Sequence, residues 1–133
     1  MIHNAHRFHG RSSLRFVYQR GQSVRGNNVS LRYVRNTRQK AYRLAVVVSR
    51  KVSKSAVVRN RIRRRVYEIV RTHARQINGT YDLVFIVYDE SLAVLPHAEV
   101  RQTILSQLHK AGVLVAAADV LNHGIVKSKE TTV

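Results

Sequence analysis

The sequence predicts a single α+β domain with the element order α-β-β-β-α-β-α, and three observations support this prediction. The chain has 133 residues, which is enough for one domain with one modest core. Two β-branched apolar runs, at residues 42–49 and 81–88, have the composition of central strands. Residues 55–71 lie between these runs and repeat apolar side chains at helical spacing. A strand, a helix and a second strand in this order form a βαβ unit if the strands lie parallel.

The elements before this unit are predicted from shorter patterns. Ser12 is expected to cap a short helix over residues 13–20. Gly21 then ends that helix, because glycine adopts the left-handed conformation easily. Residues 22–25 are compatible with a short strand. Residues 29–35 alternate apolar and polar side chains, which predicts a longer strand with one buried face.

The elements after the unit follow from a turn and a second helical pattern. Asn78 and Gly79 form a turn signal before the strand at 81–88. Residues 97–110 predict a helix whose apolar face consists of Val100, Ile104, Leu105 and Leu108. Residues 113–121 are apolar and either prolong that helix or cover one end of the core.

The domain limits follow from these elements. We expect a flexible N-terminus over residues 1–9 and the folded domain over residues 10–112. A C-terminal extension is expected over residues 113–133, partly helical and then a loose tail.

The charge of the chain is strongly positive and unevenly distributed. The formal net charge is +17, which indicates a nucleic-acid partner or an anionic surface. Residues 1–76 hold 20 Lys and Arg with one acid, whereas residues 77–133 hold 4 Lys and Arg with 6 acids. Nucleic-acid binding is therefore expected in the first three-fifths of the chain. Arginine predominates over lysine, which suits bidentate contacts with phosphate and stacking on bases.

The helix predicted over residues 55–71 concentrates this charge. It has six arginines between Arg59 and Arg71. One arc of the helix is apolar and predicts a buried face of Ile62, Val66, Ile69, Val70 and His73. Arg59 with Arg63, and Arg61 with Arg65, form like-charge pairs that each cost about 0.2–0.5 kcal/mol. We therefore expect an external polyanionic partner; the alternative, a merely solvated face, is disfavoured because Glu68 is the single acid in this helix.

Several functional classes are not supported by the sequence. The chain has no cysteine, so disulfides and Cys-based zinc sites are excluded. The first residues have no apolar signal-peptide core, and no run of 18 apolar residues predicts a membrane span, so a cytoplasmic protein is expected. The spacing of His3, His6 and His9 is possible for a metal site, but no carboxylate or thiolate accompanies it, and a frayed terminus is the preferred interpretation.

The sequence also argues against catalysis by the protein itself. A two-metal nuclease needs converging carboxylates, and the acids here are spread over a strand, a connection, a helix and a tail. The sequence has no Ser-His-Asp order and no glycine-rich phosphate loop. We therefore predict no catalytic residue and no metal ligand in this chain.

Four motifs in order carry a resemblance to a known family. The arginine helix contains Arg59, Asn60, Arg61, Ile62, Arg63 and Arg64. Before it, an apolar strand from Leu44 ends in Ser49, Arg50 and Lys51, and after it an apolar strand begins at Asp82. The early helix runs from Leu14 to Gly21 with aromatic residues before the glycine. With these motifs the chain resembles the protein subunit of bacterial ribonuclease P, over about residues 8–110.

The resemblance implies a fold and a function. The implied fold is a four-stranded mixed sheet with helices packed on one side and a left-handed crossover through the arginine helix, although about 98% of such connections are right-handed. The implied function is to assist a catalytic RNA subunit, which uses Mg²⁺ bound mainly by that RNA. The complex would hydrolyse one phosphodiester and release the 5′ leader of precursor tRNA, with one protein per RNA.

The resemblance also implies two sets of binding residues. The RNA subunit would be bound by Lys54, Arg59, Asn60, Arg61, Arg63 and Arg64. The leader would lie as a single strand in a cleft between the first helix, the sheet and the arginine helix. Its candidate walls are Leu14, Tyr18, Val29, Leu31, Tyr33, Val46 and Val48, with Arg50 and Lys51 at one end. The pattern does not assign which face of the sheet forms the cleft, so some of these residues belong to the core.

Three other functions remain as alternatives. The best is a ribosomal protein that binds ribosomal RNA structurally, because such chains share this size and charge. A DNA-binding module is disfavoured because the arginine helix is flanked by strands rather than by a partner helix. A protein-only nuclease is third. The RNA that copurifies with the chain distinguishes a ribonuclease P subunit from a ribosomal protein. One RNA of a few hundred nucleotides supports the first, and intact ribosomal subunits support the second.

Overall fold

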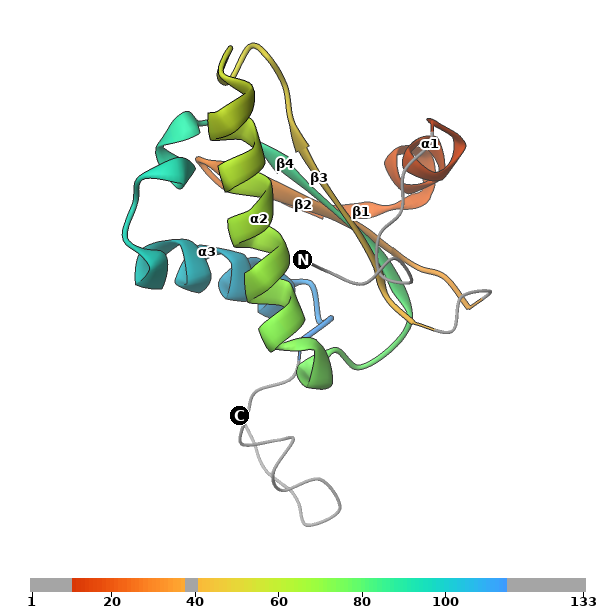
Figure 1. Cartoon of the computed structure of the whole chain (residues 1–133). Coiled ribbons are helices and arrows are strands. Elements are labelled where there is room, and N and C mark those ends of the chain that lie inside the picture. The colour runs from red at the N-terminus through yellow and green to blue at the C-terminus, as the bar shows by residue number, and fades with distance from the viewer. Residues whose placement is uncertain (1–10, 38–40, 115–133) are drawn as a thin grey trace.

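The computed structural model describes residues 11–37 and 41–114 (Figure 1). Their helices and strands follow the predicted order α-β-β-β-α-β-α: α1 (Arg11–Arg20), β1 (Gln22–Val24), β2 (Val29–Arg35), β3 (Arg43–Val48), α2 (Ala56–Thr72), β4 (Tyr81–Val87) and α3 (His97–Lys110). Two short 3₁₀ helices lie in the connections: η2 (Ala74–Gln76) and η3 (Glu90–Ala93). In this part of the chain no helix is long and apolar enough to cross a membrane.

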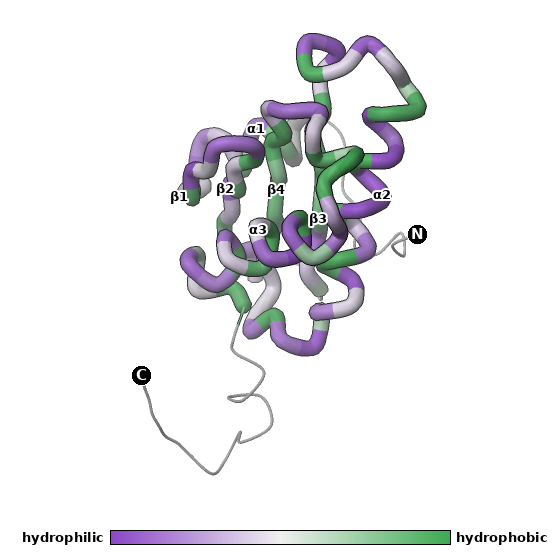
Figure 2. Tube along the Cα trace, turned by 90° about the vertical axis from the view of Figure 1, so that its left-hand side faces the viewer, coloured by the Kyte–Doolittle hydropathy of each residue, from purple (hydrophilic) through white to green (hydrophobic). Residues whose placement is uncertain are grey.

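The four strands form one mixed sheet in the order β1-β2-β4-β3. The pairs β1–β2 and β2–β4 are antiparallel, and β3 pairs with β4 in parallel. Figure 2 looks onto the face that α2 and α3 cover, and there β4 lies to the left of β3. The two strands are parallel, and both run upward in Figure 1 and therefore also in Figure 2, which is turned about the vertical axis. The connection through α2 is therefore left-handed, as the resemblance implied and against the general rule.

The main core lies between this face of the sheet and the helices α2 and α3. The sheet contributes the alternate side chains Val29, Leu31, Leu44, Val46, Val48, Leu83, Phe85 and Val87. The helix α2 contributes Ile62, Val66, Ile69 and Val70, which confirms its predicted buried face. His73, the fifth predicted member, is only half-buried, and its Nδ1 lies 2.9 Å from the Ile69 carbonyl oxygen.

The helix α3 buries the predicted residues Val100, Ile104 and Leu108, while Leu105 is half-buried. It also buries Gln107, which the apolar pattern missed. The amide Nε2 of Gln107 donates a hydrogen bond to the Val29 carbonyl oxygen, and so replaces a contact with water.

The first helix packs on the opposite face of the sheet, so the expectation that all helices share one side is wrong. Figure 1 shows α1 across the sheet from α2 and α3. Val17 of α1 is fully buried against Ala45 of β3 and Val84 of β4. These strand residues point away from the main core because side chains alternate along a strand. Gly21 follows α1 directly, and a Cβ there would lie 2.4 Å from the Val17 carbonyl oxygen of α1 and 2.9 Å from the Tyr33 carbonyl oxygen of β2. Glycine is therefore required for α1 to approach β2 so closely.

Two of the predicted limits differ from the structure. Ser12 lies inside α1 rather than before it, since the helix begins at Arg11. The helix α3 ends at Lys110, as predicted, and Gly112 beyond it takes a positive φ of 77°. Val113 and Leu114 then pack into the core, so the folded unit passes the expected limit at residue 112. The predicted segments 1–9 and 115–133 lie outside the described residues.

A buried ion pair ties β3 and β4 together on the α1 side. The side chain of Asp82 is fully buried and accepts two hydrogen bonds of 2.9 Å from the Arg43 guanidinium. It also accepts one of 2.8 Å from the Asn36 amide. The carboxylate therefore links β4 to β3 and to the end of β2.

We predict that Asp82→Ala lowers the free energy of unfolding by about 3 kcal/mol, because it removes the carboxylate from a largely buried cationic site. Urea unfolding followed by circular dichroism measures this loss. Glu68→Ala is the matched control, because Glu68 also pairs with an arginine, Arg71, but both side chains are about half exposed. An equal loss in both variants would contradict the structural role of Asp82.

Candidate nucleic-acid interface

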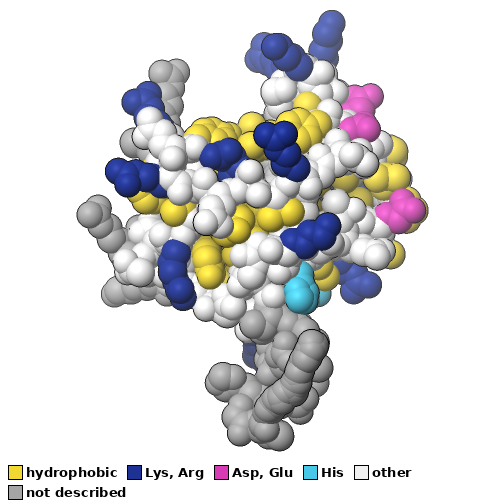
Figure 3. All heavy atoms as spheres, turned by 180° about the vertical axis from the view of Figure 1, so that it is seen from behind, with side chains coloured by type: hydrophobic (Ala, Val, Ile, Leu, Met, Phe, Trp, Pro, Cys, Tyr) yellow, Lys and Arg dark blue, Asp and Glu magenta, His cyan; other side chains and the backbone are white. Residues whose placement is uncertain are grey.

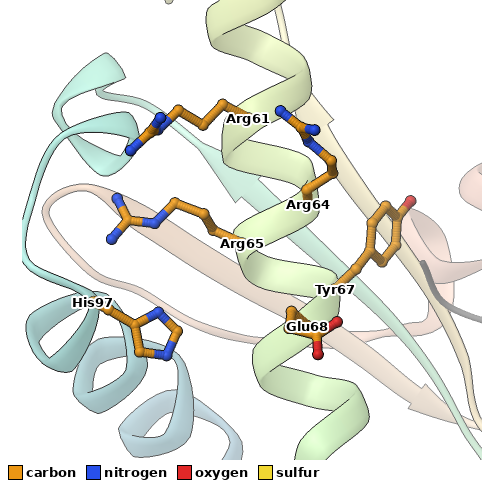
Figure 4. A pocket seen from close by; sticks show the side chains of 6 residues that line it. All are labelled: Arg61, Arg64, Arg65, Tyr67, Glu68 and His97. Atoms are coloured by element: carbon orange, nitrogen blue, oxygen red, sulfur yellow. The ribbon is translucent and has the colours of Figure 1, made fainter.

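The arginines of α2 leave the helix in different directions. Arg61 and Arg65 extend toward the connection between β4 and α3 (Figure 4). The Nε of Arg61 donates to the Ala93 carbonyl oxygen at 2.7 Å. The Nη1 and Nη2 atoms of Arg65 donate to the carbonyl oxygens of Leu92 and Leu95, at 2.7 and 2.6 Å. Backbone acceptors from another part of the chain therefore hold both guanidinium groups.

Arg59 and Arg63 extend instead toward the loop that precedes α2. Arg59 donates to the Ser53 carbonyl oxygen at 2.9 Å, and Arg63 to the Val48 carbonyl oxygen at 3.4 Å. Arg63 also donates to Oδ1 of Asn60 at 2.9 Å. Both members of each like-charge pair therefore donate hydrogen bonds to backbone carbonyl oxygens of the protein. These bonds partly offset the repulsion expected between the two guanidinium groups.

Arg64 differs from these four arginines. It is exposed, and within residues 11–37 and 41–114 no hydrogen-bond or ion-pair partner is found for it. Lys54, Arg50 and Lys51 are exposed in the loop before α2. The helix begins after Ser55, whose side chain accepts a hydrogen bond from the Val58 amide. The predicted RNA-subunit residues lie on α2 and in the loop before it, and we call them together the arginine surface: Lys54, Arg59, Asn60, Arg61, Arg63 and Arg64.

A cavity of about 400 Å³ adjoins the arginine surface (Figure 4). It is lined by Arg61, Arg64, Arg65, Tyr67, Glu68 and His97. The single acid among these, Glu68, forms an ion pair with Arg71, and this hydrogen-bonded contact lowers the pKa of the Glu68 carboxyl. The lining therefore has a net positive charge suited to phosphate.

The face of the sheet that carries α1 has a different chemistry. Its strand side chains include the half-buried Val34, Val47 and Ile86 beside the buried pair Ala45 and Val84. Phe16 and Tyr18 of α1 are 42% and 40% exposed, and Tyr88 after β4 is 53% exposed. In the view from behind, hydrophobic side chains form a band with Lys and Arg between and beside them (Figure 3). We call the surface of Phe16, Tyr18, Arg32, Val47, Ile86 and Tyr88 the α1 face.

Arg32 joins α1 to β2 on this face. Its Nη2 donates to the carbonyl oxygens of Tyr18 and Gly21. The guanidinium carbon lies 5.6 Å from the centroid of the Tyr18 ring, within cation–π distance. Burial raises the pKa of the Tyr18 hydroxyl, the charge of Arg32 opposes this rise, and Tyr88 adds to it. The two tyrosines and the arginine therefore share one environment.

The structure separates the candidate cleft residues into two groups. Leu14 and Tyr18 lie on the α1 side, and Arg50 and Lys51 follow the end of β3. Four candidates are wrong as cleft walls, because they are buried in the main core under α2 and α3: Val29, Leu31, Val46 and Val48. Tyr33 shares their face, is half-buried, and donates from its hydroxyl to Gln22 at 2.9 Å.

The residues that the sequence missed are those at the alternate strand positions: Arg32, Val47, Ile86 and Tyr88. The alternation of side chains along each strand places these residues on one face of the sheet. It does not indicate which of the two faces the helices α2 and α3 cover.

Among the described residues, no group of three or more His, Asp or Glu side chains is arranged so that it could hold a metal ion. The candidates His3, His6 and His9 lie outside that part of the chain. Asp82 is engaged by Arg43 and Asn36, and the side chain of Asp89 accepts from the Ser91 amide at the start of η3.

Comparison with known proteins links this arrangement to one family. The family model for Ribonuclease P matches residues 2–112. The ribonuclease P protein component of Clostridium kluyveri is 37% identical over 111 residues, which cover 82% of this chain and 96% of that protein. The RNase P protein of Thermotoga maritima has a TM-score of 0.70 and 26% identity, covering 78% and 96% of the two chains. The Staphylococcus aureus protein shares the fold with a TM-score of 0.74 at 23% identity, covering 83% and 98%. The matches extend over nearly the whole folded unit, and the chain therefore belongs to the ribonuclease P protein family.

Proposed function

We propose that this chain is the RNA-binding subunit of ribonuclease P, which assists a catalytic RNA in removing the 5′ leader from precursor tRNA. The observation that carries the proposal is the presence of two different surfaces around one sheet. The arginine surface is cationic and held by backbone carbonyls, whereas the α1 face combines exposed aromatic rings with one arginine. Two such surfaces suit two RNA molecules with different structures.

The arginine surface is the proposed contact with the RNA subunit. A folded RNA presents phosphates at fixed positions, and an arginine fork binds phosphate in a bidentate manner. Arg64 is exposed for this purpose, and Arg59, Arg61 and Arg63 each keep N–H groups beyond those that donate to carbonyl oxygens. One protein is proposed to bind one RNA in the cytoplasm.

The α1 face is the proposed contact with the leader. A single strand has unpaired bases, which stack on aromatic rings with about 1–3 kcal/mol per base. Phe16, Tyr18 and Tyr88 offer such rings, and Arg32 brings a positive charge beside them. Neither stacking nor charge neutralisation reads base edges, so leaders of many sequences would be accepted. Arg50 and Lys51 neutralise phosphates where the strand passes the end of β3.

The chemistry itself is assigned to the RNA, with Mg²⁺ bound mainly there. The described acids of this chain support that assignment, because Asp82 lies in a buried ion pair and Asp89 caps η3. The protein would bind and orient the RNA and neutralise its charge, and Mg²⁺ held by the RNA would supply the activated water.

We predict that replacing Arg59, Arg61 or Arg64 by Ala weakens binding of the RNA subunit and lowers the log–log salt slope. Each lost phosphate contact should reduce the slope by about 0.7–0.9. Filter binding over a range of KCl concentrations measures both quantities. Arg101→Ala on the exposed side of α3 is the control and should leave the slope unchanged. Unchanged slopes in the α2 variants would mean that these residues do not touch phosphate.

We predict that Tyr18→Ala weakens binding of precursor tRNA to the holoenzyme by about tenfold, because one stacked base is lost. Tyr18→Phe keeps the ring and should retain most of the affinity. Mature tRNA without a leader provides the second control, and its binding should be the same for all three proteins. An equal loss for mature tRNA would place Tyr18 outside the leader contact.

We predict that the protein lowers the Mg²⁺ concentration at which the RNA cleaves precursor tRNA, because its cations reduce repulsion between crowded phosphates. Single-turnover cleavage by the RNA with and without protein over a Mg²⁺ titration measures this change. Identical titration curves would refute the assisting role. This reconstitution also separates the proposal from a structural ribosomal role, for which the protein would leave the Mg²⁺ titration of the RNA unchanged.

A further inference from the structure

Arg65 lies directly after the arginine surface in the sequence and has a different environment from Arg64. We infer that Arg65 is a positioning residue, which holds the carbonyl group that orients Arg61 toward the RNA subunit. This inference rests on the proposed function, since it concerns how the arginine surface is prepared for RNA.

Arg65 donates hydrogen bonds to residues before and after Ala93, whose carbonyl oxygen accepts the hydrogen bond from Arg61. Arg61 donates from Nε to the Ala93 carbonyl oxygen. Arg65 donates from its two Nη atoms to the carbonyl oxygens of Leu92 and Leu95, which flank Ala93 in the sequence. The guanidinium of Arg65 therefore fixes the short segment in which the Ala93 carbonyl lies (Figure 4).

The acceptor segment is itself firmly anchored. Leu92 and Ala93 are 1% and 3% exposed, so their side chains belong to the core. Their carbonyl groups lie at the end of η3, where the last turn leaves acceptors without helical partners. Arg61 and Arg65 satisfy these acceptors from a helix about 30 residues earlier in the chain.

The hydrogen bond through Nε leaves the outer edge of Arg61 available. Neither Nη atom of Arg61 has a hydrogen-bond partner within the described residues, and the side chain lines the 400 Å³ cavity. A guanidinium held through Nε presents its remaining donors at a fixed angle, which suits bidentate binding of phosphate. Ordering one long side chain before binding is expected to raise affinity about three- to tenfold.

Arg65 has fewer donors left for such a contact. Both of its Nη atoms are engaged, and the side chain is only partly exposed. Burial and the neighbouring charge of Arg61 both lower the pKa of the Arg65 guanidinium. The two cations repel each other, and the three carbonyl oxygens offset that repulsion. Lysine cannot replace Arg65, because one ammonium group does not span two carbonyls as a planar fork does.

A double-mutant cycle tests the inference on the reconstituted complex. Binding of the RNA subunit is measured for the wild type, Arg65→Lys, Arg61→Ala and the double variant, at a temperature at which circular dichroism shows every protein folded. Arg65→Lys should weaken binding about three- to tenfold when Arg61 is present and have almost no effect when Arg61 is Ala. Arg71→Lys is the control on the same helix and should show no coupling with Arg61.

Two results of the cycle would overturn the inference. An equal loss in both backgrounds would mean that Arg65 contacts the RNA directly. Unchanged binding, with or without a lower melting temperature, would mean that Arg65 only supports the fold or does nothing. If Arg65→Lys fails to fold, Arg65→Gln takes its place in the cycle.

A measurement without RNA separates this inference from the proposed function. In the free protein, the Nε–H of Arg61 should give a slowly exchanging NMR signal, and Arg65→Lys should accelerate its exchange with solvent. Exchange that does not depend on Arg65 would refute the positioning role, even if RNA binds. Absence of RNA binding by the wild type would refute the proposed function, while the NMR result still decides the role of Arg65.

Discussion

The burial of one apolar stripe of α2 is the interaction on which the remaining features depend. Ile62, Val66, Ile69 and Val70 are almost completely buried, and each contributes about 1.5–3 kcal/mol. The like-charge pairs on the same helix cost only about 0.2–0.5 kcal/mol each. Packing therefore exceeds repulsion by several-fold, and a helix crowded with arginine remains docked on the sheet.

Hydrogen bonds to backbone carbonyl oxygens also offset the repulsion, and each pair of arginines has its own set of these acceptors. Arg59 and Arg63 donate to carbonyls before α2, and Arg61 and Arg65 donate to carbonyls at the end of η3. These bonds occupy only part of each guanidinium. These bonds hold the arginine side chains in the absence of RNA, and the remaining donors stay available for the phosphate contacts proposed above.

The position of α1 divides the sheet between two tasks. The face under α2 and α3 is filled by core side chains, whereas the described apolar cluster on the other face is smaller, with Val17, Ala45 and Val84 as its buried members. Aromatic rings and Arg32 therefore stay partly exposed beside α1. Binding of the leader on this face, as proposed above, would leave the arginine helix free for the RNA subunit.

The sequence by itself determined the element order, the buried stripe of α2 and the arginine motif, because helical and strand periods depend on residues close together in the chain. Only the tertiary structure decided which face of the sheet is covered. Val29 and Arg32 belong to opposite faces of β2, and alternation alone treats both faces equally. The same holds for Arg65, whose acceptors Leu92 and Leu95 are brought to it only by the fold. The burial of Gln107 and Asp82 could not be predicted from the sequence pattern either, because a buried polar side chain depends on a hydrogen-bond partner from a distant segment.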